Sequence, residues 1–150
     1  IYVPEIYGDP ALLLPKFYKP IKINDLKNKI GVIPHKTNYH HYLDKVDSTK
    51  FFLINPTNNW KDVINYLYSC KSIVSSSLHG LVCGDAYNKP NIWLNEYKLD
   101  EGDFKFKDYF SSQNREYVKI NSLSEYDDTL LYTEGNKINL EKLISVFPFF

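Results

Sequence analysis

The sequence predicts an α/β domain with a Rossmann-like parallel sheet and helices on both faces. Two observations support this: short apolar runs recur along the chain, and helical patterns lie between them. Strands that alternate with helices are typical of parallel sheets, because parallel neighbours need a crossover connection. The 150 residues suffice for one hydrophobic core, so we expect a single domain over residues 1–150.

The first two strands are expected in the apolar runs 29–34 and 51–56, each of which ends at a proline. Continuous apolar runs of this length are typical of parallel strands that are buried on both faces. Between residues 59 and 70, apolar residues recur at helical spacing, and residues 57–59 offer N-cap side chains. Trp60 belongs to this apolar stripe, so we assign it to the core.

A third strand is predicted at 72–75, and it is followed at once by a helix from about residue 78 to 87 that Pro90 helps to end. The remaining elements are expected as strands at 91–94 and 117–120 and a closing helix over 140–147. Residues 95–114 are mostly polar and predict a functional loop with one short helix.

Charge and cysteine content exclude several classes of protein. Lysine and arginine together number 18, as do aspartate and glutamate, so no excess of positive charge exists to neutralise nucleic acid. Cys70 and Cys83 lack the spacing of a zinc site, and we assign both to the core. No apolar run is long enough to cross a bilayer, so we expect a cytoplasmic protein, either free or peripheral at the inner membrane face. Because the sequence has no methionine, we expect it to be part of a longer protein.

Residues 73–80 carry the clearest chemical signal, because a strand ends there in three serines and a helix begins with a histidine in its first turn. Ligands bind at the carboxyl ends of parallel strands, and the N–H groups at a helix start favour an anion. Ser75, Ser76 and Ser77 add hydroxyl donors. His79 can bind a phosphate or carry a proton. From the residues alone, a structural interpretation is as well supported as an anion site. In that interpretation one serine caps the helix and His79 packs in a crevice.

Two other polar residues are candidates for the same cleft. His35 follows the first strand, so it either faces the cleft of His79 or is an exposed loop residue. Asp9 precedes Pro10 at the start of a short apolar helix, where N-capping explains it fully. We therefore favour a structural role for Asp9.

Lys105 and Lys107 alternate with Phe104 and Phe106. This pattern fits either a half-buried strand with outward lysines or a lid that places cations over a phosphate. The adjacent His40 and His41 lie in a polar stretch without a matching carboxylate, so we expect them to be solvated and predict no metal site.

Four segments resemble, in the same order, segments of the polysaccharide pyruvyl transferases. The most specific is Ser-Ser-Ser-Leu-His-Gly-Leu-Val at 75–82 with Asp-Ala-Tyr at 85–87; the others are 7–15, 30–35 and 104–109. The resemblance covers about residues 7 to 110. It implies a two-lobed fold similar to GT-B glycosyltransferases, in which this chain is the C-terminal lobe and an N-terminal lobe is missing.

The resemblance also implies an activity: transfer of a pyruvyl group from phosphoenolpyruvate to a saccharide, free or lipid-linked, in bacterial exopolysaccharide or cell-surface glycan biosynthesis. Phosphoenolpyruvate is then the donor substrate, and no separate cofactor is needed. His79 matches the family's histidine at the phosphoenolpyruvate site, and Leu78, the other residue of this Leu-His pair, is expected to take part in substrate binding. Some members have arginine at the position of Ser77, so we expect Lys105 or Lys107 to supply the positive charge.

Two alternatives stay open. One is the nucleotide-sugar-binding lobe of a GT-B glycosyltransferase, and the other is a non-catalytic module that binds anions. Since only one wall of a cleft is expected here, we predict that the isolated chain folds but does not catalyse.

Overall fold

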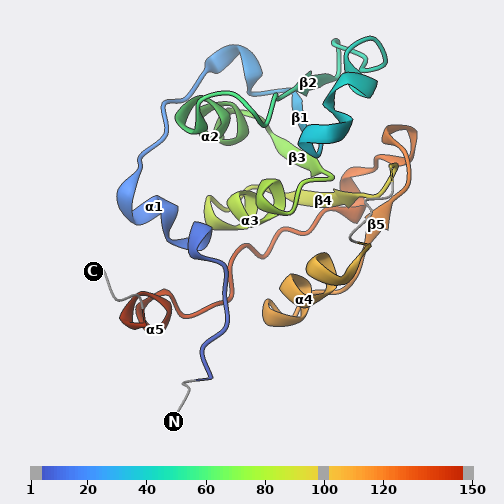
Figure 1. The fold of residues 1–150 in the computed structure, drawn as a ribbon. Coiled ribbons are helices and arrows are strands. Elements are labelled where there is room, and N and C mark those ends of the chain that lie inside the picture. Colours follow the sequence, from blue (N-terminus) through green and yellow to red (C-terminus); the bar gives the residue numbers. More distant parts are fainter. Residues whose placement is uncertain (1–4, 98–101, 147–150) are drawn as a thin grey trace.

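The computed structural model describes residues 5–97 and 102–146, and in this part of the chain five strands form one parallel sheet (Figure 1). The strand order is β2-β1-β3-β4-β5. The strands are β1 (Ile30–Ile33), β2 (Phe51–Leu53), β3 (Ser72–Ser75), β4 (Asn91–Leu94) and β5 (Lys119–Ile120). The α-helices are α1 (Leu14–Phe17), α2 (Trp60–Ser69), α3 (Leu78–Ala86), α4 (Phe104–Ser112) and α5 (Leu140–Ser145). The 3-10 helices are η1 (Pro10–Leu13), η2 (Asn24–Leu26), η3 (Lys36–Tyr42), η4 (Leu123–Glu125) and η5 (Asp128–Leu130).

The α/β prediction is confirmed, because every predicted strand and helix is present close to its expected bounds. All four residues of β1, β3 and β4 are buried, as continuous apolar runs predict. Asn59 caps α2 by accepting a hydrogen bond from the Lys61 N–H at 3.0 Å. The strand interpretation of 104–107 is wrong, because these residues begin α4. The closing helix was expected to reach residue 147, which lies outside the described residues.

Both faces of the sheet are covered. On one face, Ile73 and Trp93 pack with the long helices α2, α3 and α4. On the other, Val74 and Ile92 pack with Tyr42 from η3 and with side chains from the segment that carries η4. Right-handed crossovers explain this division, because the connection from β1 to β2 runs in the opposite direction to the later ones. The second layer consists of 3-10 helices and irregular chain in the described residues.

The strand order reverses between β1 and β3. The chain leaves β1 toward β2 on one side, and β3 then pairs with β1 on the other, with Ile33 opposite Ser75. In open parallel sheets, ligands bind at the carboxyl ends of the strands at such a switch point. The residues that follow β1 and β3 are therefore side by side where a ligand is expected.

The two ends of the described chain pack together. Leu12 and Leu13 of η1 share a buried cluster with Leu143 of α5.

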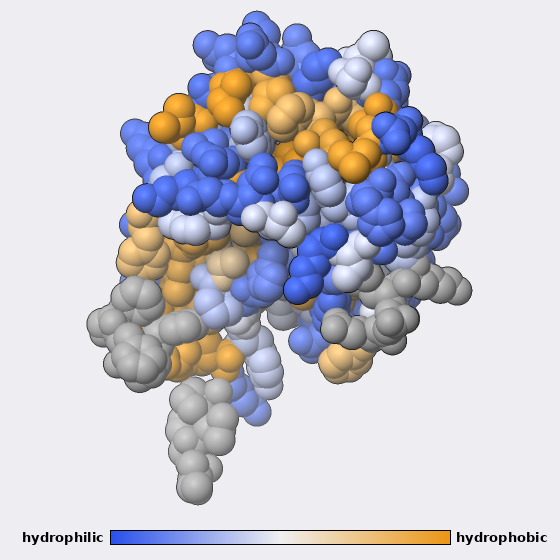
Figure 2. Space-filling view, turned by 45° about the horizontal axis from the view of Figure 1, so that its top comes forward, coloured by the Kyte–Doolittle hydropathy of each residue, from blue (hydrophilic) through white to orange (hydrophobic). Residues whose placement is uncertain are grey.

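Figure 2 shows one face of the molecule, on which hydrophobic atoms gather in an upper area and at the lower left, with hydrophilic atoms between them. Within residues 5–97 and 102–146, no helix is long and apolar enough to cross a membrane.

Candidate functional site

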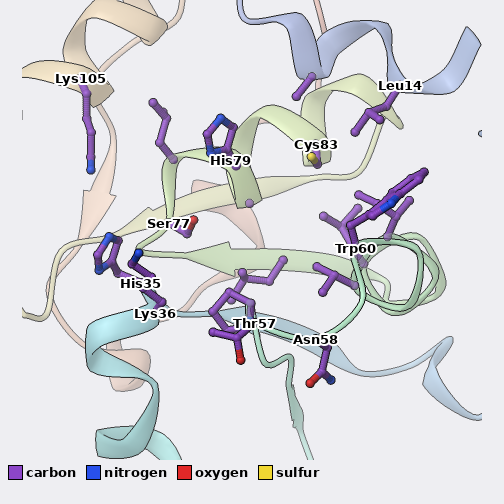
Figure 3. A pocket seen from close by; sticks show the side chains of 18 residues that line it. Leu14, His35, Lys36, Thr57, Asn58, Trp60, Ser77, His79, Cys83 and Lys105 are labelled. Atoms are coloured by element: carbon purple, nitrogen blue, oxygen red, sulfur yellow. The ribbon is translucent and has the colours of Figure 1, made fainter. Parts of the chain in front are cut away.

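A pocket of about 620 Å³ lies at the carboxyl ends of β1, β2 and β3, between α2 and α3 (Figure 3). Its polar wall comes from the loops after these strands and from the start of α3: His35, Lys36, Thr57, Asn58, Ser77 and His79. Lys105 reaches it from α4. The apolar wall comes from η1, α1, α2 and α3: Ala11, Leu14, Trp60, Val63, Ile64, Leu67 and Cys83.

The three serines have different places. Only Ser77 lines the pocket, and its side chain does not cap α3. Ser75 is fully buried; its hydroxyl can donate to the Ile33 or the Ser77 carbonyl, both at 2.8 Å, and it accepts from the Ser77 N–H. Ser76 is also buried and accepts from the His35 N–H at 2.9 Å. Contrary to the expectation that all three serines line one anion site, Ser75 and Ser76 lie behind the wall and join the two loops that form it.

Gly80 allows α3 to pack closely on this junction. A Cβ atom at Gly80 would lie 2.2 Å from the Ser75 Oγ and 2.9 Å from the Ser75 Cβ. No residue with a side chain fits there without displacing Ser75 or the helix. The glycine after His79 thus brings the start of α3, with its N–H groups and positive dipole end, to the carboxyl ends of β1 and β3.

His79 is exposed at the mouth of the pocket and pairs with Asp9. Its Nε2 lies 3.5 Å from the Asp9 Oδ2, with the two side chains 73% and 20% exposed. The hydrogen bond with Asp9 raises the pKa of His79, against burial and the charge of Lys105. Burial acts to raise the pKa of Asp9, but the hydrogen bonds from His79 and the Ala11 N–H outweigh it and lower that pKa. The pair therefore favours a charged imidazolium beside a carboxylate.

The polar end of the pocket carries the positive charges of Lys36 and Lys105, and that of His79 when its imidazole is protonated. These three residues and His35 gather at one end in Figure 3, while Trp60, Leu14 and Cys83 lie at the other. The Nδ1 atom of His35 caps η3 by accepting a hydrogen bond from the Thr37 N–H. No acidic residue lines this pocket among the residues that the structure describes. Cations, a helix N-terminus and a serine hydroxyl together suit a phosphate or carboxylate.

The side chains of Lys105 and Lys107 lie on different sides of α4. Lys105 lines the pocket, whereas Lys107 is exposed elsewhere on α4. Residues two apart on an α-helix point in nearly opposite directions, so both cannot face one ligand. A role for Lys107 at the pocket does not fit this geometry.

Three features of the site escaped the sequence interpretation. Trp60 is half-exposed on the pocket wall, so its assignment to the core is wrong; it is the first residue of α2, where periodicity constrains the buried face least. Lys36, which lines the pocket, was not predicted as a site residue. Its position directly after His35, at the carboxyl end of β1, could have indicated it. Asp9 caps η1 as expected. Its pairing with His79, which lies 70 residues further along the chain, was not predicted.

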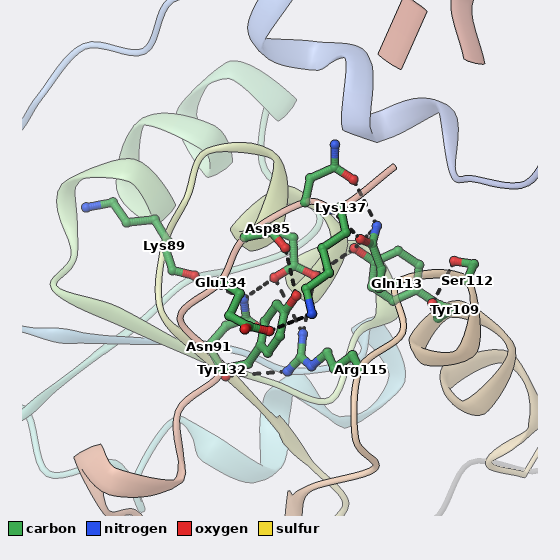
Figure 4. A network of polar contacts seen from close by, with 12 residues as sticks. Asp85, Lys89, Asn91, Tyr109, Ser112, Gln113, Arg115, Tyr132, Glu134 and Lys137 are labelled. Carbon is green, nitrogen blue, oxygen red and sulfur yellow. Dashed lines mark hydrogen bonds and ion pairs between the residues drawn. The ribbon is translucent and has the colours of Figure 1, made fainter. Parts of the chain in front are cut away.

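A buried polar network holds the other end of α3 (Figure 4). The Asp85 carboxylate lies 3.3 Å from the Arg115 guanidinium and accepts hydrogen bonds from Asn91 and Tyr109, each at 2.7 Å. Asp85 and Arg115 are almost completely buried, so each charge depends on the other. This network joins α3 to β4 and to the end of α4, and it gives Asp85, the first residue of the Asp-Ala-Tyr motif, a structural role.

The cysteines are packed in the core, whereas the paired histidines lie nearer the surface: His40 is exposed, as expected, and His41 is half-buried. Cys70 and Cys83 are buried, which confirms their assignment to the core. Burial raises the pKa of the Cys83 thiol to about 12, so it stays protonated at neutral pH although it lines the pocket. His41 stacks on Tyr97 with ring centroids 4.6 Å apart. In the described ranges, no group of three or more His, Cys, Asp or Glu residues is placed to hold a metal ion.

The fold and the pocket define a class: an α/β domain with a pocket at the switch point of its parallel sheet, where lysine and histidine side chains line the polar end. The chain belongs to the polysaccharide pyruvyl transferase family, whose sequence profile matches residues 1–96. This match includes three of the four segments that carry the resemblance and ends before the fourth, 104–109.

One curated relative is the uncharacterized protein L143 of Acanthamoeba polyphaga mimivirus, which is 29% identical over 93% of this chain and 56% of its own length. The chain thus spans about half the length of this relative. No solved structure matches the chain, so the likeness to the GT-B fold stays a prediction.

Proposed function

We propose that this chain supplies the phosphoenolpyruvate-binding part of an enzyme that transfers a pyruvyl group to sugar hydroxyls. The observation that carries the proposal is the cationic pocket at the junction of β1 and β3, in a chain of the pyruvyl transferase family. Phosphoenolpyruvate carries a phosphate and a carboxylate close together. It therefore suits a site with several cations and a helix N-terminus better than a neutral sugar does.

In this proposal the phosphate lies at the start of α3. Ser77 and the first N–H groups of α3 donate to it, and His79 and Lys105 balance its charge. Lys36 and His35, on the opposite side of the same end, are placed for the carboxylate. Lys105 then stands in for the arginine that some family members have at the position of Ser77.

The proposed reaction begins when the methylene carbon of phosphoenolpyruvate takes a proton and becomes a methyl group. The adjacent carbon becomes electrophilic, and a sugar hydroxyl attacks it and loses its proton. The C–O bond to phosphate breaks, and inorganic phosphate leaves with its bonding electron pair. A second hydroxyl adds to the resulting oxocarbenium ion and loses its proton, which gives the ketal. Charge builds up on the departing phosphate, where the start of α3 stabilises it.

The acceptor is proposed to reach the donor from the apolar end, past Trp60 and Leu14, with the other wall supplied by the rest of the protein. The chain spans about half of its curated relative, which leaves room for such a second lobe. A free or lipid-linked saccharide at the cytoplasmic face of a membrane fits this arrangement. Cell-surface glycan or exopolysaccharide synthesis is the corresponding process.

The test is a product assay on the complete protein with phosphoenolpyruvate and a panel of saccharides, read by mass spectrometry and by release of inorganic phosphate. We expect a pyruvylated product from the unmodified protein and from Lys107→Ala, and a strongly reduced yield from His79→Ala. If a nucleotide sugar is consumed instead, the glycosyltransferase alternative is correct. Ligand binding without any product would favour the non-catalytic module.

A further inference from the structure

We propose that Asp9 is a positioning residue for His79: its carboxylate, which caps η1 through one oxygen, orients the imidazole at the pocket mouth through the other. For its catalytic consequence this inference rests on the proposed function, but the contact itself can be tested without any substrate. Asp9 lies outside the pocket wall, so its effect on a ligand passes through His79.

The two oxygens of Asp9 have different partners. Oδ1 accepts a hydrogen bond from the Ala11 N–H at 2.8 Å and caps η1, while Oδ2 faces the His79 Nε2 at 3.5 Å. Capping fixes the orientation of the carboxylate, because a carboxylate with one oxygen held by the backbone can turn little. The second oxygen is therefore directed at α3, and Nδ1 is the ring nitrogen of His79 that Asp9 does not engage.

The backbone that carries Asp9 is also held in place. Gly8 has a φ of +148°, and a Cβ atom there would lie 3.2 Å from Ile138 and 3.3 Å from Leu143. The turn thus packs directly on α5 and the residues before it. A salt bridge from Lys16 to Glu141 joins α1 to the same helix. The far end of the described chain thereby fixes Asp9 relative to α3, so the contact with His79 follows from packing.

Other titratable groups face His79 from the neighbouring elements. Lys105 on α4 disfavours the charged imidazole, and His35 and Lys36 line the same pocket from the loop after β1. Cys83, one turn along α3, has a thiol whose pKa is raised by burial and by Asp9. Asp9 is thus the one acidic partner of His79 among the residues described, and it opposes the positive charges of Lys105 and Lys36 in the same pocket. Without it, the cations favour the neutral imidazole.

The decisive variant is Asp9→Asn, because asparagine caps a helix as well as aspartate but carries no charge. Asp127→Asn is the matched control: Asp127 also caps a 3-10 helix, accepting from the Thr129 N–H at 2.8 Å, and is exposed on another part of the molecule. The measurement is an NMR titration of the His79 imidazole in the protein without ligand. We expect a lower His79 pKa in Asp9→Asn, an unchanged one in Asp127→Asn, and partial recovery in Asp9→Glu. Equal His79 pKa values in Asp9→Asn and the unmodified protein would overturn the proposal.

The second readout is the pH dependence of pyruvyl transfer by the complete protein. Because Asp9 raises the pKa of His79, the charged imidazole persists to higher pH in the unmodified protein. In Asp9→Asn, activity should therefore decline at lower pH on the alkaline side, with its value at acidic pH largely retained. A lower activity with an unshifted profile would contradict the positioning role. If the titration shows the expected difference but neither the unmodified protein nor any variant forms product, the proposed function is wrong while the Asp9–His79 contact stands.

Discussion

The change Gly80→Ala tests the packing on which the pocket depends. The new Cβ would lie 2.2 Å from the Ser75 Oγ and 2.9 Å from the Ser75 Cβ, and Ser75 is fully buried and hydrogen-bonded to both loops. Overpacking costs about 1–3 kcal/mol, displaced hydroxyl bonds cost about 1–3 kcal/mol, and alanine returns about 1 kcal/mol of helix propensity. We expect a net loss of about 3 kcal/mol in the free energy of unfolding.

Urea unfolding of the 150-residue chain, followed by circular dichroism, measures this loss. Gly84→Ala is the matched control, since it gains the same helix propensity and its Cβ would lie no closer than 3.1 Å to its nearest neighbour, the buried Asn91 side chain, against 2.2 Å at Gly80. We expect a clearly smaller loss there. In a Ser75→Ala background, Gly80→Ala should cost less than in the unmodified chain, because the closest atom is gone. Equal stability of the Gly80→Ala and Gly84→Ala variants would refute the reasoning.

Three further changes separate binding, catalysis and stability. His79→Ala should lower the rate of pyruvyl transfer by about 10²-fold or more and leave the urea midpoint unchanged, because the side chain is largely exposed; near-normal turnover would exclude it from the reaction. Lys105→Ala should weaken phosphoenolpyruvate binding about tenfold in calorimetry, as expected for one charge-assisted contact, while Lys107→Ala should not. Asp85→Ala should cost about 3–5 kcal/mol in unfolding free energy, because Arg115 is left as a buried, uncompensated charge; a loss below that of an exposed pair would show that the network is not buried in solution.

The order of strands and helices could be predicted because the apolar runs are short and end in clear signals. β3 and α3 are the best example, since three serines and a histidine mark the junction between them. The position of the pocket followed from the same junction, because parallel strands present their carboxyl ends at one edge of the sheet. His35, Ser77, His79 and Lys105 do meet there.

The inner serines, Lys107 and Asp9 could not be placed from sequence alone. Whether a serine faces the pocket or the β1 loop depends on the register of β3 against β1, which is a long-range property. The alternation of Phe and Lys at 104–107 fits a strand locally. In the helix that forms instead, Phe106 packs on Trp93 with ring centroids 4.5 Å apart, and Tyr109 and Phe110 join the same core cluster, a long-range arrangement that the local pattern does not contain. The partner of Asp9 is distant in sequence and is brought near by the packing of η1 on α3.

The most direct test of the central claim is to map phosphoenolpyruvate binding by NMR on the isotope-labelled chain. The account predicts that the largest amide shifts occur at Ser77, Leu78 and His79, with a second group at His35 and Lys36, and that inorganic phosphate perturbs the first group more than the second. Shifts centred away from this pocket, for example around Tyr132, which pairs with Asn91 at the start of β4, would contradict it.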